Sequence, residues 1–462
     1  MSQPATLFYI FNLTKAVRNF GKGGVIEALV QQGFRVIAFG VKPDQRDGIK
    51  KAFGDDVEFE ELGAAPHSGM MRRIERLVTY IWRSRIDYQA VRIRHGYDGR
   101  FKAVLWVELL IGRLLQPLPV WFWERLQEFF SRWPKGDKLC EKYHPCGVLI
   151  SNPIDTTANV LNWSKRRGLY TGAVIESWDN LTIRGGLYTY PHDMYVWGDL
   201  MKNEAANFHK LPAGRIQTTG LPSFDMYWAE QLYPTESSWR KQMQLPENVP
   251  VVSYATSPAV RQKSQDGYLD IMLNAVKNGK LPANTHFLVR IHREDDAAIY
   301  QRLKNEPHVR IQTTDASLEG MEPDMGRPMM LAATMRYSSV LVCLFSTTVL
   351  DAMANHTPSI ACAFDPADEN GGTPEIQKSI RRFLNDKHIK DMMAYEAVFI
   401  ASSESELVTH LTSCLADKHC NAPAREKCLL ATLGDHKGRS AQLFASTLKS
   451  RIQPFLARTG SP

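Results

Sequence analysis

Cationic side chains gather at one point in the second half of the chain. Arg290, His292 and Arg293 lie at and just beyond the end of an apolar run, His286–Ile291. Guanidinium groups form paired hydrogen bonds to phosphate oxygens, and such groups are rarely buried without a partner. The run therefore predicts a strand whose end holds a diphosphate. The alternative is a solvated turn in which these side chains form ion pairs with the two acidic residues that follow.

Three hydroxyl residues follow another apolar run and open a predicted helix. Ser346, Thr347 and Thr348 could bind phosphate together with the N–H groups of the helix start, where the helix dipole favours an anion. Ser346 could equally cap the helix without any ligand. Asp351, further along this helix, could hold a ribose or sugar hydroxyl or be a surface charge. Ser257, after another predicted strand, would line the same crevice.

Carboxylates follow two predicted strands in the first half of the chain. Asp155, Glu176 and Asp179 could each accept the proton of an attacking hydroxyl group, as a general base does. Asp179 and Asn180 could instead form a turn, for which both residue types are favoured. Trp178 could stack on a sugar ring or simply pack.

A glycine-bearing turn follows the first predicted strand and contains Arg18 and Asn19. Its glycines would let a ligand approach the backbone, but their spacing is not the GxGxxG of dinucleotide-binding folds. We expect Arg18 and Asn19 to contact a substrate and no nicotinamide cofactor to bind.

Apolar runs alternate with helical patterns, which predicts an α/β protein with parallel sheets. The predicted strands are 7–11, 35–40, 147–151, 171–176, 193–197 and 215–219, then 251–255, 286–291, 309–312, 340–345 and 359–363. A polar linker separates the two series. We expect two doubly wound, Rossmann-like domains, 1–235 and 245–400, and a helical tail, 401–462. Because ligands of open parallel sheets bind beyond the carboxyl ends of the strands, the residues above should face a cleft between the domains.

A basic and then aromatic segment interrupts the first domain as a predicted helical insert at about 70–135. Of the net charge of +7, residues 72–102 carry +6, from nine basic and three acidic residues. Eight aromatic residues follow in 101–133. This pattern favours peripheral contact of residues 72–133 with anionic lipid at the inner membrane, and the alternative is packing of the aromatic residues onto the first domain. Because no recognition motif accompanies the arginines, we expect no nucleic-acid partner.

Composition excludes several classes of protein. The 462 residues, 44% hydrophobic and 23% charged, are those of a globular chain long enough for two or three domains. No uncharged apolar stretch reaches the length of a membrane span, and the first residues lack a secretory leader. Seven scattered cysteines form no CxxC pair, so we expect reduced thiols, a cytoplasmic location and no metal. Walker and GxSxG motifs are absent.

Six short motifs can be compared with those of known families. They are Ser177–Thr182, Val196–Gly198, Lys202–Ala205, Thr219–Asp225, Arg18–Phe20 and Ser346–Ala352. Together they resemble motifs of GT-B glycosyltransferase-like proteins from bacterial envelope and capsule polysaccharide clusters. A more distant likeness is to teichoic-acid glycerophosphotransferases, in which a Trp-His-Gly-Thr-Pro loop supplies the catalytic His. Trp178–Thr182 stands in the equivalent place, so the likeness implies Asp179 at the base position. The family's His-Pro pair reads His292-Arg293 here, which favours glycosyl over glycerophosphoryl transfer.

The expected function is metal-independent transfer of a sugar from a nucleotide-sugar donor to an envelope or capsular glycan, free or lipid-linked. Asp179 would be the base, with Asp155 as the substitute. The donor would contact Arg290, His292, Arg293, Ser346, Thr347, Thr348, Asp351 and Ser257, and the acceptor Trp178, Asn180, Arg18 and Asn19. Two alternatives remain: a nucleotide-sugar epimerase of the same fold, and a non-catalytic protein that binds nucleotide sugars or glycans.

Overall fold

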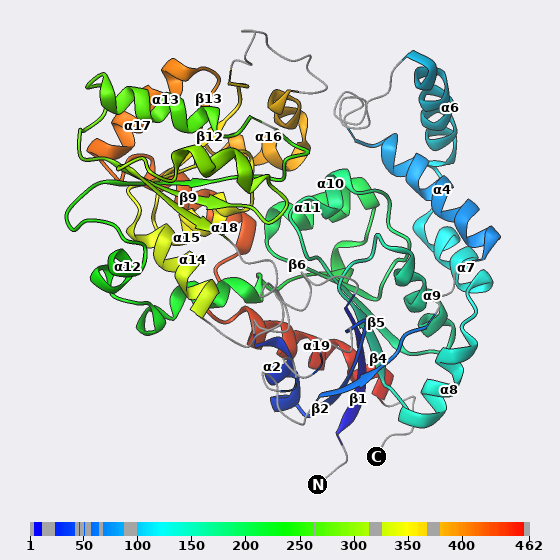
Figure 1. The fold of residues 1–462 in the computed structure, drawn as a ribbon. Coiled ribbons are helices and arrows are strands. Elements are labelled where there is room, and N and C mark those ends of the chain that lie inside the picture. The colour runs from blue at the N-terminus through cyan, green and yellow to red at the C-terminus, as the bar shows by residue number, and fades with distance from the viewer. Residues whose placement is uncertain are drawn as a thin grey trace.

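The computed structural model describes residues 4–11, 24–41, 46, 50, 57–63, 68–86, 99–262, 264–313, 326–366 and 379–456. Arg18 and Asn19 lie outside these ranges. Two parallel sheets form the framework, one in each half of the chain (Figure 1). The prediction of two doubly wound domains is thereby confirmed.

The first sheet has seven strands in the order β3-β2-β1-β4-β5-β6-β7. They are β1 Ala5–Ile10, β2 Phe34–Phe39, β3 Val57–Glu60, β4 Gly147–Ile150, β5 Tyr170–Val174, β6 Asp193–Val196 and β7 Ile216–Thr218. β1 shows why the apolar runs become strands. Leu7 and Tyr9 pack into one core, while Phe8 and Ile10 pack into another on the opposite face. A parallel sheet covered on both faces needs such continuous apolar runs.

The second sheet has six strands in the order β10-β9-β8-β11-β12-β13. They are β8 Val251–Ala255, β9 His286–Ile291, β10 Val309–Thr313, β11 Val340–Cys343, β12 Ser359–Cys362 and β13 Phe399–Ala401. Since β8 pairs with both β9 and β11, the ends of these three strands lie side by side. The predicted phosphate-binding residues are therefore on neighbouring strands.

Helices cover the faces of both sheets. Those before the second sheet are α2 Val25–Gln31, α4 Gly69–Arg83, α6 Gly99–Leu115, α7 Val120–Phe130, α8 Pro134–Tyr143, α9 Asn159–Arg166, α10 Asn180–Ile183, α11 Asp199–His209 and α12 Glu236–Gln242. Those that follow are α13 Gly267–Lys277, α14 Gly326–Tyr337, α15 Thr348–Ala354, α16 Lys387–Met393, α17 Glu404–Ala416, α18 Ala422–Leu433 and α19 Ser440–Leu456. The segment predicted as a helical insert thus contains α4, α6 and α7.

No single helix in the described part of the chain has both the length and the apolar composition of a membrane span. Ala103–Leu115 and Val120–Phe130 meet these criteria only as a pair, and the pair is bent by 106°.

The last helix returns from the second half of the chain to the first sheet. Figure 1 shows α19, in red, beside α2 and the strands of the first sheet, and α19 packs against α2. The Asp225 carboxylate accepts hydrogen bonds from the N–H groups of Ser440 (3.0 Å) and Ala441 (2.9 Å), which begin α19. Gly220, with φ +77°, lies so close to Ser440 that a Cβ atom there would stand 2.4 Å from the Ser440 hydroxyl oxygen. The motif Thr219–Asp225 therefore holds the C-terminal helix.

Replacing the capping carboxylate should destabilise the fold. Asp225→Ala leaves two N–H groups at the start of α19 without their acceptor, and loss of such a cap costs about 1–2 kcal/mol. Thermal and denaturant unfolding would measure the change. Asp435→Ala is the matched control, because Asp435 is exposed and makes a loose ion pair with Lys437 at 3.8 Å. Equal stability of the two variants would contradict the capping role.

Candidate functional site

The loop after β5 contacts the second half of the chain. Its residue Trp178 lies with its ring centroid 5.0 Å from that of His388 on α16. The Thr182 hydroxyl lies 3.2 Å from Nδ1 of the same histidine. The predicted first-domain loop thus lies where the two halves of the chain meet. His388 was missed in the sequence because its partners are about two hundred residues away.

Asp179 is buried at the start of α10. Its carboxylate accepts a hydrogen bond from Nε of Arg184 at 2.9 Å. Asn180 is also buried, and its amide oxygen accepts the Ser177 N–H at 2.8 Å. Asn180 therefore shapes the loop that presents Asp179, as the turn interpretation anticipated.

Asp155 lies in the loop after β4 and has a local structural role. One of its carboxylate oxygens accepts both the N–H (2.8 Å) and the hydroxyl (2.7 Å) of Thr157. Such a turn is a common use of Asp. Of the two carboxylates proposed as the base, Asp155 thus bonds within its own turn, and Asp179 lies in a loop that contacts the second half of the chain.

A further carboxylate, on α11, was not singled out in the sequence. Glu204 is buried, and its pKa lies well above the ordinary value. Burial is the main cause; the charges of Asp391 and Asp179 raise the pKa further, and Lys387 opposes them. Glu204 lines a small cavity of about 20 Å³ together with Trp178, Leu350, His388 and Asp391. A cavity of this size holds about one water molecule, so the two halves of the chain pack closely at this part of their interface.

In the second sheet, the predicted histidine is held at the ends of two strands. The His292 N–H donates to the Thr256 hydroxyl at 2.8 Å, which ties the end of β9 to the end of β8. The N–H of Glu294 donates to Nδ1 of His292 at 3.1 Å. A neutral imidazole whose Nδ1 accepts carries its proton on Nε2, so that nitrogen is the hydrogen-bond donor.

The two arginines beside it differ in environment. Arg290 is half-buried on β9, and its charge counteracts the strong rise that burial causes in the pKa of Tyr227. Arg293 is exposed and pairs with Glu294 at 3.3 Å, as the solvated-turn interpretation predicts. Arg290 is thus the guanidinium group that lies near the junction of the two halves.

Asp351 takes part in that junction. It accepts a hydrogen bond from the hydroxyl of Tyr227, which lies in the short helix Pro222–Trp228. This hydrogen bond joins the two halves of the chain. Ser257 is buried, and its N–H donates to the Gln265 side chain at 2.7 Å, so Ser257 shapes the loop after β8.

The hydroxyl residues after β11 are more accessible. Ser346 accepts the N–H of Thr348 at a long 3.4 Å, which is a weak form of the predicted cap, and Thr347 is exposed. Two arginines that were missed in the sequence lie nearby. Arg261 donates to the Phe345 carbonyl at 3.1 Å, and Arg261 and Arg382 both lie over the ring of Phe383. The available signal was that Arg261 lies in the loop after β8, six residues beyond the end of that strand.

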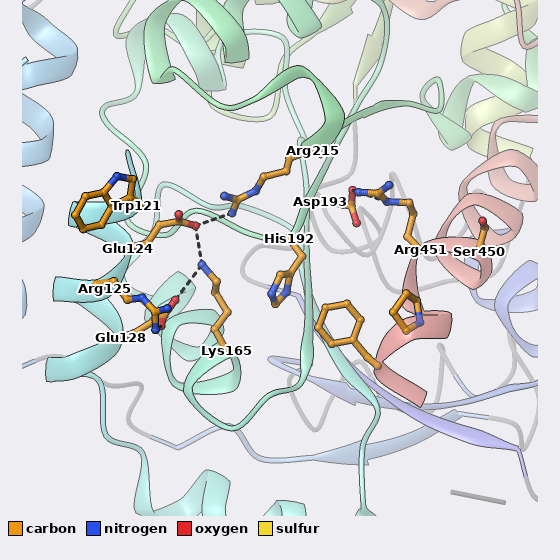
Figure 2. Close-up of a pocket in the computed structure, with 12 residues that line it drawn as sticks. Trp121, Glu124, Arg125, Glu128, Lys165, His192, Asp193, Arg215, Ser450 and Arg451 are labelled. Atoms are coloured by element: carbon orange, nitrogen blue, oxygen red, sulfur yellow. Dashed lines mark hydrogen bonds and ion pairs between the residues drawn. The ribbon is translucent and has the colours of Figure 1, made fainter. Parts of the chain in front are cut away.

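A cavity of about 710 Å³ lies away from this cleft, at the amino end of β6 (Figure 2). Lys165 pairs there with Glu124 (2.8 Å) and Glu128 (3.2 Å), and Arg215 also reaches Glu124, at 2.7 Å. Burial lowers the pKa of His192 to about 3, so this ring is neutral. At this edge of the sheet, opposite the strand ends, most of the charged side chains that line the cavity are paired with one another.

No protein-family model matches the chain, and no curated protein matches it in sequence. Solved structures do match over nearly the whole length. UDP-GlcNAc 2-epimerase from Neisseria meningitidis, bound to UDP-GlcNAc, is 12% identical with a TM-score of 0.54, over 96% of this chain and 100% of that chain. A glycosyltransferase from Rickettsia africae is 12% identical with a TM-score of 0.51, over 98% and 99% of the two chains. The wall teichoic acid polymerase TagF is 12% identical with a TM-score of 0.51, over 98% and 90%.

The chain has a GT-B fold. At these identities the likeness establishes the architecture, and it includes both epimerases and transferases. Among the described residues, no group of three or more His, Cys, Asp or Glu is arranged to hold a metal ion.

The buried Glu204 predicts a specific pH dependence of stability. A carboxyl group whose pKa is raised in the folded state favours folding at acidic pH, and this contribution is lost as the pH rises from about 4.5 through the raised value. Glu204→Gln keeps the shape and cannot ionise. Its free energy of unfolding should therefore fall less than that of the wild type between acidic and alkaline pH.

Denaturant unfolding across this pH range would test the prediction. Glu426→Gln, on the exposed side of α18, is the matched control and should follow the wild type. If Glu204→Gln also follows the wild type, the raised pKa is wrong.

Proposed function

We propose that the protein is a glycosyltransferase that moves a sugar from a nucleotide-sugar donor to a glycan of the bacterial envelope or capsule. One observation supports the proposal: a cationic strand end and a buried carboxylate loop, from different sheets, each lie near the junction of the two halves of the chain. The charge of Arg290 acts on Tyr227 of the first half, and the loop that carries Asp179 contacts His388 of the second half.

In this proposal the donor diphosphate binds at the ends of β8, β9 and β11. Arg290 and the Nε2–H of His292 donate to phosphate oxygens, and Ser346 and Thr347 lie at the neighbouring strand end. Arg261 and Arg382 add positive charge along the same edge. Asp351 and Ser257 support this binding surface, and Arg293 provides a solvent-exposed charge at its rim.

The transfer step then requires a base. The acceptor hydroxyl oxygen attacks the anomeric carbon, the bond from that carbon to the diphosphate oxygen breaks, and Asp179 takes the hydroxyl proton. The leaving diphosphate carries the negative charge, which the cationic strand end stabilises. Trp178 and Asn180 belong to the loop that would contact the acceptor, and no metal or organic cofactor is invoked.

A second candidate is a nucleotide-sugar epimerase. The observation in its favour is that epimerases with this fold match the chain as well as transferases do. Nuclear magnetic resonance of a nucleotide sugar incubated with the protein alone separates the two. A changed sugar configuration without acceptor supports epimerisation, and turnover that requires a glycan acceptor supports transfer.

Removing the strand-end cations should weaken donor binding. Each charge-assisted hydrogen bond contributes about 1.5–3 kcal/mol, so Arg290→Ala and His292→Ala should each raise the donor dissociation constant about tenfold or more. Calorimetric titration with nucleotide sugars measures this. Arg310→Ala is the control, because Arg310 lies at the opposite end of the same sheet and donates to the Gln244 carbonyl at 2.8 Å. Unchanged affinity in both site variants would refute the assignment.

Replacing the base should separate binding from transfer. Asp179→Asn keeps the shape of the side chain but cannot accept the proton, so donor affinity should persist while kcat falls about 10²–10⁴-fold. Asp155→Asn is the comparison. If Asp155→Asn alone abolishes transfer, the base is Asp155, and if both variants keep full activity, neither carboxylate is the base.

A further inference from the structure

Helix α6 is apolar on two opposite faces, and the structure covers one of them. Leu105 and Leu109 are buried, and Gly112 lies so close to α4 that a Cβ atom there would stand 2.1 Å from the Tyr80 carbonyl oxygen. The Gln116 side chain donates to the Ser84 hydroxyl at 2.7 Å. This face anchors α6 on α4, as Figure 1 shows at the edge of the molecule.

The other face of α6 is exposed. Val107, Leu110 and Leu114 recur at spacings of three and four residues, so they form one stripe along the helix. Their exposed fractions are 55%, 59% and 70%, and Val104 and Trp106 flank them at 51% and 56%. Beyond the break at Pro117 and Pro119, α7 adds two large exposed residues, Trp121 at 63% and Phe129 at 69%. Because only one apolar face of α6 packs on the protein, the second apolar face suits a further apolar partner.

In the described part of the insert, the acidic residues are buried or paired, while many of the arginines are exposed. All four acidic residues in the described positions 68–86 and 99–133 are turned inward: Glu75 is buried, Glu108 pairs with Arg83, and Glu124 and Glu128 pair with Lys165. Six arginines in the same positions are exposed, so the outer surface of the insert is basic as well as apolar. They are Arg72, Arg73, Arg76, Arg113, Arg125 and Arg132.

We infer that α6 and α7 dock this protein on an anionic lipid bilayer, with the apolar residues in the interfacial layer and the arginines at the phosphate headgroups. Ala103–Leu115 would extend only about 20 Å as a helix, which is shorter than the roughly 30 Å hydrocarbon core. With the 106° bend to α7 and one face held by α4, α6 lies along the surface rather than across it. A second copy on this face would bring like charges together in a twofold contact, which disfavours a dimer.

Helix α4, on which α6 packs, connects this surface to the candidate site. The Trp82 indole N–H on α4 donates to the Leu181 carbonyl at 3.4 Å, and Arg85, just after α4, donates to the Phe208 carbonyl at 3.3 Å. Leu181 lies in α10, two residues after Asp179. Docking through α6 would therefore place the acceptor loop beside the membrane. If the proposed transferase activity holds, the acceptor class that this position suits is a lipid-linked glycan.

Sedimentation with vesicles tests the docking without any donor or acceptor, so its result is independent of the proposed activity. Wild-type protein should bind phosphatidylcholine vesicles that contain phosphatidylglycerol, bind pure phosphatidylcholine less, and dissociate as salt rises. Leu110→Ser with Leu114→Ser should weaken binding at least tenfold. Arg72→Ser with Arg73→Ser should weaken it roughly thirtyfold, at about tenfold per 1.4 kcal/mol.

Lys427→Ser with Leu430→Ser is the matched control, since both residues are exposed on α18, outside the insert. It should bind as the wild type does, and unchanged thermal melting should show that every variant folds. Wild-type protein that fails to bind anionic vesicles would overturn the proposal. So would a dimer in sedimentation velocity that Leu110→Ser with Leu114→Ser dissociates, because a second copy would then occupy this face.

Discussion

The contact between Asp225 and the start of α19 ties the end of the chain to the first sheet, and the arrangement of the site depends on this tie. The catalytic candidates and the phosphate-binding candidates lie in different halves of the chain, so neither half contains a complete site. The hydrogen bond from Tyr227 to Asp351 adds a second link, only two residues after the cap. One short segment, Pro222–Trp228, thus connects to both α15 and α19. It therefore contacts one helix that packs on the second sheet and one that packs on α2 beside the first sheet.

Much of this framework was predictable because strands of parallel sheets are continuous apolar runs. The sequence limits of β8 and β9 agree with the structure, since each run is buried on both faces and is bounded by polar residues or proline. β3 was missed because Val57–Glu60 alternates between apolar and acidic residues at a sheet edge, where only Val57 is fully buried. β13 was missed because three residues are too few to show a pattern.

The candidate site was less predictable, for a physical reason. The position of a residue directly after a strand indicates where its side chain lies, but it does not indicate which other residue that side chain contacts. Asp351 was a plausible ligand for a hydroxyl group, and in the fold it accepts a hydrogen bond from Tyr227, 124 positions earlier. Glu204 was recognised only as part of the motif Lys202–Ala205, because the residues that surround it, among them Asp391 and Leu350, are distant in the sequence. Several motifs that carried the family resemblance prove to be structural: a Cβ atom on Gly198 would stand 2.6 Å from the Thr432 carbonyl oxygen on α18.

The central claim is that a nucleotide diphosphate binds at the ends of β8, β9 and β11, within the cleft. Hydrogen–deuterium exchange with and without nucleoside diphosphates and nucleotide sugars tests this claim most directly. The account predicts that a bound nucleotide slows exchange in residues 256–262, 290–296 and 344–350, with a smaller effect in the loop 176–184. Slowed exchange confined to the residues around the 710 Å³ cavity, or no slowing at these strand ends with a nucleotide that demonstrably binds, would contradict it.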